Sequence, residues 1–420
     1  MITRIEGLNY RCLRYVDQPL EPFHILVGPN ASGKTTFLDV VAFCSRVVSD
    51  GLEAALSERS ATFTDLVFGR EGSGFELAVE AAIPARLRES STAAADADSI
   101  RYELAVAADP QTGEIGIQSE SVRFREAGEP VELVQKALFP SSPPAPETIQ
   151  LPSRRGMRRA VSKSPEGVAN FYSEVYREAG KGWVVNFRLG PQKSALGNLP
   201  EDASKFPVTT WFKELLTTGI QSFVLDSQAM RLASPPGQTR RFKPDGSNLP
   251  WVIDEFRRTA RAEFREWINH LQTALPDIED IDTIERPDDR HRYLVVQYRG
   301  GLRIPSWTTS DGTLRLLALT LPAYLPNARG VFLIEEPENG IHPRAVETVF
   351  QALCSVYDAQ VLLASHSPVL LSIADPEQIL CFAKEETGAV DIVRGSEHPE
   401  LRHWQRETSL GDMFAAGVLG

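Results

Sequence analysis

The sequence predicts an α/β fold: a largely parallel sheet assembled from both ends of the chain, an antiparallel β meander, and a helical insertion between them. Three observations predict it. A glycine-rich loop at 28–35 joins an apolar segment, 23–27, to a segment with helix-like spacing. Two aliphatic runs, 330–334 and 360–364, have the length and composition of buried parallel strands. Alternating apolar and polar residues between 75 and 124 are typical of antiparallel strands.

The loop at 28–35 has the spacing G-x-x-x-x-G-K-[ST] and lies between a strand and a helix, as a phosphate-binding loop does. Its two glycines let the backbone curve around an anion, so that N–H groups and the helix N-terminus point at phosphate oxygens. The lysine can reach the β- and γ-phosphates, and the threonine can offer its hydroxyl to Mg²⁺. We therefore expect a P-loop NTPase fold that holds a nucleoside triphosphate and Mg²⁺. A glycine-containing strand-to-helix turn that matches by chance is the alternative interpretation. The residues expected to bind the nucleotide here are Gly28, Pro29, Asn30, Ala31, Ser32, Gly33, Lys34, Thr35 and Thr36.

The composition is that of a globular protein. The chain has 420 residues, 42% of them hydrophobic and 24% charged, so it exceeds one typical domain and can bury a core. A net charge of −12 excludes a uniformly basic nucleic-acid sleeve but not a local basic groove. No apolar run reaches membrane-spanning length, so we expect no membrane partner. The four scattered cysteines form no C-x-x-C pair, which indicates small core residues in the reducing cytoplasm rather than a zinc site.

Three regions are expected along the chain. Residues 1–130 form an N-terminal ATPase lobe with the β meander, 131–292 an insertion that is mainly helical, and 293–420 a C-terminal ATPase lobe. A proline-rich connector at 138–153 opens the insertion. The polar faces of the meander strands predict a sheet packed on one side only. The clearest helix is expected at 251–272, and its apolar face comprises Ile253, Phe256, Ala260, Phe264, Trp267 and Leu271.

Two carboxylates end the aliphatic run at 330–334. Glu335 is placed to hold Mg²⁺ and its water shell, and Glu336 is placed to orient or deprotonate the attacking water. Most such ATPases carry aspartate at the first position, and the longer Glu335 suggests coordination through water. An acidic loop that only caps a buried strand is the alternative interpretation of Glu335 and Glu336.

A histidine and a short serine-glycine motif complete the set. His366 follows the run at 360–364, so it is expected at the carboxyl edge of the sheet, where it could donate a hydrogen bond to the γ-phosphate. Ser310 and Gly312 precede an apolar helical run, and a helix N-terminus of this kind can hold an anion. Taken singly, His366 could be a structural histidine and Ser310 an ordinary helix cap.

In this order, the four motifs resemble the ABC-type ATPase head shared by SMC-like proteins and the overcoming-lysogenization-defect (OLD) family. The strongest resemblance is to stand-alone bacterial AAA-type ATP-binding proteins of phage-defence and toxin-like operons. The segments that carry it are 28–35 (Walker A), 310–312 (signature), 335–343 (Walker B and its following loop), 365–368 (switch histidine) and the ending 409–420.

The resemblance covers about 1–125 and 295–420, and it has three departures. No residue matches the glutamine loop of ABC heads. No long heptad arm of the SMC type is present. The part of the chain after His366 is too short for the nuclease domain of OLD proteins, and no Asp-x-Asp follows, so we expect no nuclease activity in this chain.

The resemblance implies Mg²⁺-dependent ATP hydrolysis in a homodimer, or a higher even oligomer, that closes around ATP. The catalytic residues would be Glu336, Lys34 and His366, with Thr35 and Glu335 at the metal, and Ser310 and Gly312 would act on the nucleotide of the other copy. ATP would then act as a clamp that controls a separate effector such as a nuclease, or a DNA contact, in phage defence or DNA maintenance. Two alternatives are an ATP-binding scaffold or sensor with incidental hydrolysis and, less favoured, the ATPase subunit of a transporter.

Basic clusters bear on the question of DNA. Arg154-Arg155 and Arg158-Arg159 lie beside Lys163, and Arg240-Arg241 lie beside Lys243. Such clusters can follow a phosphate backbone, but solvated loops often carry them too.

Overall fold

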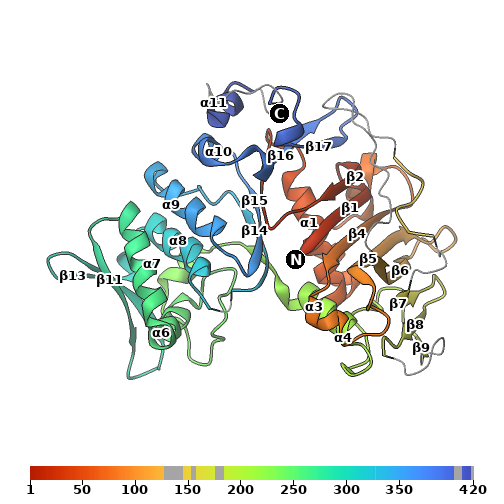
Figure 1. Ribbon diagram of the computed structural model, residues 1–420, viewed down its shortest axis with the longest axis horizontal. Coiled ribbons are helices and arrows are strands. Elements are labelled where there is room, and N and C mark those ends of the chain that lie inside the picture. The colour runs from red at the N-terminus through yellow and green to blue at the C-terminus, as the bar shows by residue number, and fades with distance from the viewer. Residues whose placement is uncertain (127–144, 153–157, 176–183, 327, 402–408, 418–420) are drawn as a thin grey trace.

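The computed structural model describes residues 1–420 except 127–144, 153–157, 176–183, 327, 402–408 and 418–420. Among the described residues there are three sheets. In Figure 1 an eight-stranded sheet lies at the right, the helices α6–α9 lie at the left, and a six-stranded sheet stands between them. The helices are α1 (Lys34–Asp50), α2 (Leu52–Ser57), α3 (Ala85–Arg88), α4 (Pro207–Glu214), α5 (Ser227–Arg231), α6 (Leu249–Thr259), α7 (Arg261–Ala274), α8 (Asp311–Thr320), α9 (Pro343–Cys354), α10 (Pro368–Ile373) and α11 (Leu410–Ala415).

The six-stranded sheet brings the two ends of the chain together. Its strands, in spatial order, are β10 (Ile220–Phe223), β14 (Gly330–Glu335), β15 (Ala359–Ala364), β3 (Phe23–Val27), β16 (Ile379–Lys384) and β17 (Val390–Arg394). Neighbours from β10 to β16 pair in parallel, and only β17 is antiparallel. This confirms the parallel strands expected at 330–334 and 360–364. Because β15 lies between β14 and β3, the residues after these three strands meet at one edge of the sheet.

Helix α1 fills the space between this sheet and the larger one (Figure 1). Successive side chains of a buried strand point to opposite faces of the sheet, so each strand contributes side chains to two hydrophobic cores. On the α1 side the first core includes Leu26, Val331, Leu333, Leu362 and Ala364. On the other side, against α8 and α9, the second core includes Ile25, Val27, Phe332, Ile334 and Leu363. Both faces of the parallel sheet are therefore covered, as such sheets require.

The eight-stranded sheet is an antiparallel meander and confirms that part of the sequence prediction. Its strands, in spatial order, are β2 (Leu13–Pro19), β1 (Ile2–Tyr10), β4 (Gly74–Ala82), β5 (Ala97–Ala108), β6 (Ile115–Glu126), β7 (Arg159–Lys163), β8 (Val168–Tyr172) and β9 (Val184–Arg188). The expectation of mainly helical structure within the insertion at 131–292 was wrong for the described residues between 159 and 188. Strands β7–β9 extend the meander there, because β7 pairs with β6, and the first helix among the described residues after β6 begins at Pro207.

The polar side of this sheet also differs from expectation. We predicted packing on one side only, yet Arg101 and Glu103 on that side are 1% and 2% exposed. Residues 145–152 cross the polar side and cover it. Alternation with charged residues does not distinguish a solvated face from a face of buried ion pairs, because both have period two.

A three-stranded antiparallel sheet supports the helices at the left of Figure 1. Its strands are β11 (Ile278–Glu285), β12 (Arg292–Tyr298) and β13 (Leu302–Pro305). The single helix expected at 251–272 is two helices, α6 and α7, because Ala260 leaves the helical conformation at φ −138°, ψ 66°. The apolar face was predicted correctly, since all six of its residues are buried. No helix within the described ranges has the length and apolar character needed to cross a bilayer.

Candidate active site

Three neighbouring strands deliver the motif residues to one edge of the six-stranded sheet. The phosphate loop follows β3, Glu336 follows β14, and His366 follows β15. All three strands run parallel, so their carboxyl ends coincide, as expected for a ligand site in an α/β sheet. A cavity of about 960 Å³ opens there. Of the residues singled out from the sequence, it is lined by Asn30, Ala31, Ser32, Gly33, Lys34, Thr35, Thr36, Glu335, Glu336 and His366.

Glycine is required at two positions of the phosphate loop. Gly28 has φ +151°, and a Cβ there would lie 2.4 Å from the carbonyl oxygen of Phe382. Gly33 has φ +98°, and its Cβ would lie 2.6 Å from Val390. Both contacts are with the hairpin β16–β17, so the loop lies directly against the adjacent strands. Any side chain at these positions would move the loop away from the geometry that presents its N–H groups.

Lys34 is turned into the loop. Its ammonium donates to the carbonyls of Gly28 at 2.9 Å and Pro29 at 2.8 Å. Burial lowers the pKa of Lys34 to about 8, against the opposing effect of the Glu336 and Glu335 carboxylates. A polyphosphate in the cavity would offer this cation stronger acceptors than two carbonyl oxygens.

We expect ATP binding at pH 8.5 to be accompanied by uptake of a proton. The free protein holds Lys34 mostly neutral above a pKa of about 8, and phosphate oxygens beside it raise that pKa again. Affinity should accordingly fall as the pH rises from about 7 to 9. Titration calorimetry in two buffers of different ionisation enthalpy measures the uptake, and ATP itself is fully ionised at this pH. Identical heats in both buffers at pH 8.5 would contradict the assignment of Lys34.

Thr35 and Glu335 form the group that suits a divalent cation. The Thr35 hydroxyl donates to Glu335 Oε2 at 2.5 Å, which places two hard oxygen ligands side by side below the loop. The described residues contain no cluster of three or more histidine, cysteine, aspartate or glutamate side chains that could hold a metal. A sparse set of this kind fits Mg²⁺, which keeps several waters and takes one or two protein oxygens together with phosphates.

Glu336 has an unusual backbone conformation. Its φ is +46°, in the left-handed region that non-glycine residues rarely adopt, and its N–H donates to Ala364 at 2.8 Å. The amide of Asn339 donates to one carboxylate oxygen, and the imidazole Nε2 of His366 lies 3.8 Å from the other. Such conformations concentrate at functional sites, where the surrounding structure holds them in place. In this protein the backbone conformation of Glu336 directs its carboxylate into the cavity.

The Glu338 side chain holds the loop that carries His366. No site role was assigned to Glu338 from the sequence. Its Oε1 accepts the hydroxyl of Ser365 at 2.7 Å and the backbone N–H of His366 at 2.9 Å. Burial lowers the pKa of His366, and the nearby Lys34 cation lowers it further against the Glu336 and Glu338 carboxylates. The imidazole is therefore neutral at pH 7 and can donate or accept one hydrogen bond.

Ser310 and Gly312 do not join this cavity in the same chain. Ser310 is exposed and caps α8, where its hydroxyl accepts the Thr313 N–H at 3.2 Å. A Cβ on Gly312 would lie 2.7 Å from the carbonyl of Gly340, so the start of α8 packs against the loop after Glu336. Arg231 holds the turn that precedes α8. Its guanidinium donates to the Thr309 carbonyl at 2.9 Å and forms an ion pair with the Asp311 carboxylate at 2.7 Å.

The rest of the cavity wall could not be found from motifs. It comes from the β1–β2 turn, from the short turns at 63–70, and from the β16–β17 hairpin. These segments contribute, among others, Arg11, Cys12, Phe68, Arg70, Lys384 and Thr387. No local pattern marks them, because each reaches the cavity only through the pairing of distant strands.

Comparison with known proteins agrees with this architecture. A family model described as "AAA domain, putative AbiEii toxin, Type IV TA system" matches residues 23–150 and 187–372. Two curated relatives are the OLD nuclease of Thermus scotoductus, 46% identical over 41 residues, and the "Retron Vc95 probable ATPase" of Vibrio cholerae, 24% identical over 189 residues. These matches span 10% and 37% of this chain, and 8% and 37% of the relatives' own lengths.

Solved structures show the same fold. The crystal structure of an SMC head bound to the C-terminal winged-helix domain of ScpA has a TM-score of 0.54 at 14% identity, covering 93% of this chain and 97% of that one. The SMC head with an extended coiled coil, bound to the C-terminal domain of ScpA derived from Pyrococcus furiosus, has a TM-score of 0.52 at 13% identity and covers 99% and 98%. The P-loop head fold predicted from the sequence is thereby confirmed. Since the family model covers most of its length, the chain belongs to the AAA ATPase domain family of the AbiEii type.

Proposed function

We propose that the chain hydrolyses ATP with Mg²⁺, and that ATP-dependent pairing of two copies controls a separate effector. The observation that supports it most is the convergence of Lys34, Glu336 and His366, together with the Thr35–Glu335 pair, on one cavity. A protein that only stored ATP would not need a strained second carboxylate at the γ-phosphate end of the loop. Membership of an ATPase family makes hydrolysis the expectation.

Each residue has a distinct task in this proposal. The loop N–H groups and Lys34 bind the phosphates, and Thr35 and Glu335 hold the metal with its waters. Bound Mg²⁺ would supply charge neutralisation for the phosphoryl group in transfer. Glu336, steadied by Asn339, orients the attacking water and takes its proton. The neutral His366, whose Nε2 lies 3.8 Å from the Glu336 carboxylate, would donate a hydrogen bond to the γ-phosphate.

The position of the signature residues supports the pairing of two copies. Ser310 and Gly312 form a helix N-terminus that lies outside their own chain's cavity, so within one chain they would not contact a nucleotide bound in that cavity. A second copy related by a two-fold axis would close it with the same residues. Pairing of the two copies then requires ATP, and hydrolysis of ATP allows the copies to separate.

The relatives suggest the kind of effector. One is named as a nuclease and the other as a retron ATPase, which supports a partner nuclease and a role in phage defence. We place this role in the cytoplasm. DNA contact is a further part of the proposal. Arg154 and Arg155 lie outside the described residues, and Arg240 stacks on the ring of Trp251 at 4.4 Å.

Removal of the metal tests the proposal at its first step. We expect EDTA to reduce phosphate release to background and added Mg²⁺ to restore it, because Thr35 and Glu335 alone cannot neutralise the phosphates. Released phosphate is measured by a coupled assay, and sedimentation velocity with and without ATP follows the pairing. Unchanged turnover in EDTA would rule out a Mg²⁺-dependent ATPase, and a monomer with saturating ATP would rule out the clamp.

A further inference from the structure

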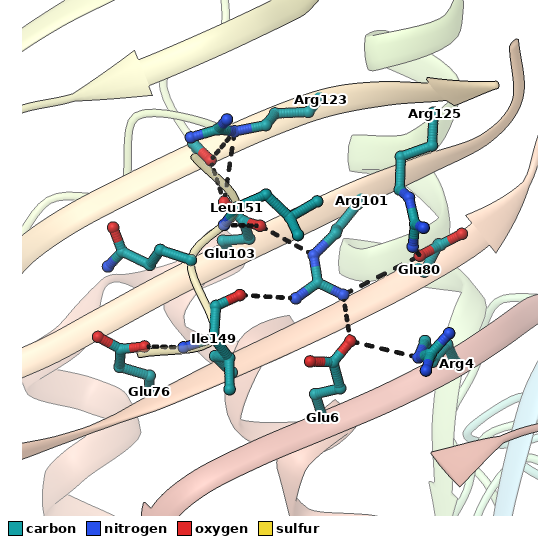
Figure 2. A network of polar contacts seen from close by, with 12 residues as sticks. Arg4, Glu6, Glu76, Glu80, Arg101, Glu103, Arg123, Arg125, Ile149 and Leu151 are labelled. Carbon is teal, nitrogen blue, oxygen red and sulfur yellow. Dashed lines mark hydrogen bonds and ion pairs between the residues drawn. The ribbon is translucent and has the colours of Figure 1, made fainter. Parts of the chain in front are cut away.

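A short segment lies across the polar side of the eight-stranded sheet, away from the nucleotide cavity. We call residues 145–152 the strap, and the charged side of β1, β4, β5 and β6 beneath it the outer face (Figure 2). The outer face carries Arg4, Glu6, Glu76, Glu80, Arg101, Glu103, Arg123 and Arg125. The strap belongs to no helix or strand, so its backbone groups need partners elsewhere.

The outer face holds the strap mainly through hydrogen bonds to the strap's backbone. Arg101 donates to the carbonyl of Ile149 at 3.0 Å, and Glu103 accepts the N–H of Leu151 at 3.0 Å (Figure 2). Glu76 accepts the N–H of Ile149 at 2.8 Å. Contacts of this kind do not depend on which side chains the bound segment carries.

Three strap side chains add to these contacts, and the smallest share comes from Ala145, which is partly buried against the cluster around Ile149. The Thr148 hydroxyl donates to Glu76 at 2.8 Å, and Ile149 packs with Leu8 and Ala78 in a small apolar cluster. Ile149 is 5% exposed, so it is the anchor of the strap. Glu147 and Pro146 beside it are exposed.

The charges of the outer face are paired with one another, independently of the strap. Arg101 forms ion pairs with Glu6 and Glu103, and Arg125 pairs with Glu80 at 2.7 Å. If the strap left, these pairs would remain and water would replace the strap's backbone groups. The strap itself buries little apolar surface beyond Ile149. Its release would therefore disturb neither large core.

From this arrangement we propose that the outer face is a docking site for an extended peptide of a partner protein, and that the strap occupies it in the absence of the partner. The site recognises two backbone N–H groups, the two carbonyls that accept from Arg101 and Arg123, one aliphatic anchor, and a hydroxyl on the residue before the anchor. A partner segment with a serine or threonine followed by isoleucine, valine or leucine fits these requirements. The inference does not rest on the proposed ATPase function, because its test contains no nucleotide.

The test supplies the strap sequence in trans. A fluorescent peptide Ala-Pro-Glu-Thr-Ile-Gln-Leu-Pro, residues 145–152, is titrated with the full chain in which residues 145–151 are replaced by glycine and serine. The replacement removes the Ile149 anchor and the Thr148 hydroxyl, so that the chain's own segment competes through its backbone groups alone. We expect saturable binding by fluorescence anisotropy, and binding at least about tenfold weaker to the unaltered chain, where the strap competes at high effective concentration. A peptide with Ile149→Asp should not bind, because a carboxylate cannot enter the apolar cluster.

Glu76 provides the matched variant. It contacts the strap and takes part in none of the ion pairs described for the outer face. In the strap-replaced chain, Glu76→Ala should weaken peptide binding about tenfold, since it removes two charge-assisted hydrogen bonds. Glu114→Ala, at an exposed turn, should leave binding unchanged. Absence of binding to a strap-replaced chain that keeps its melting temperature would overturn the proposal, as would equal binding of the Ile149→Asp peptide.

Discussion

Replacement of Glu336 by glutamine is expected to reduce ATP turnover by a factor of about 10² to 10⁴, the usual contribution of a general base. Glutamine keeps the size of the side chain and can still accept from Asn339, but it cannot take a proton from water. ATP binding should be retained, because the loop, Lys34 and the Thr35–Glu335 pair are untouched. The variant should therefore accumulate in the ATP-bound, paired state, which sedimentation velocity detects.

A matched substitution separates this effect from a general loss of charge. Glu347→Gln changes an exposed glutamate on α9 that contacts only Gln351 among the hydrogen bonds described, so turnover should stay at the level of the unaltered chain. If Glu336→Gln and the unaltered chain hydrolyse ATP equally slowly while both pair with ATP, then Glu336 is not the base. The chain would then be an ATP-binding module in which hydrolysis is incidental.

The sequence was sufficient for the parts of the site that arise from local geometry. The phosphate loop is defined by contiguous residues, and Glu336 and His366 each follow a buried strand directly. Once three strands are parallel and adjacent, their carboxyl ends must meet, so the positions of these residues followed from a correct assignment of strands. The roles given to them, including those of Ser310 and Gly312, stay predictions.

Features that depend on distant pairing could not be predicted. Strands β7 and β8 have five residues each and are strands because β6 offers an edge for pairing. The break at Ala260 has no glycine or proline beside it. It coincides with packing of Phe256 against Phe264 and Trp267, which join α6 to α7. The burial of the outer face depends on residues 145–152, which lie in the connection between β6 and β7 and contact residues of β4 and β5.

The arrangement of the two signature residues leads to the second large effect, a complementation between inactive variants. Lys34→Ala removes the cation that binds phosphate, and Ser310→Arg places a bulky side chain at the exposed start of α8. Each variant alone should lose ATP turnover, because every site in its dimer contains the defect. Loss of the Ser310 cap costs about 1 kcal/mol, so folding of that variant is checked by its melting temperature.

A mixture of the two variants distinguishes a site shared between copies from a site within one chain. If Ser310 acts on the nucleotide of the other copy, a mixed dimer contains one site with an intact Lys34 from one copy and an intact Ser310 from the other. Random association makes half of the dimers mixed, and each has one of its two sites intact, so turnover should recover to about a quarter of the unaltered level. A site completed within one chain would leave the mixture inactive at every ratio, since no polypeptide carries both residues. Recovery that rises and falls with the ratio of the two variants, with its maximum at equal amounts, would identify the second copy as the source of the missing wall of the cavity.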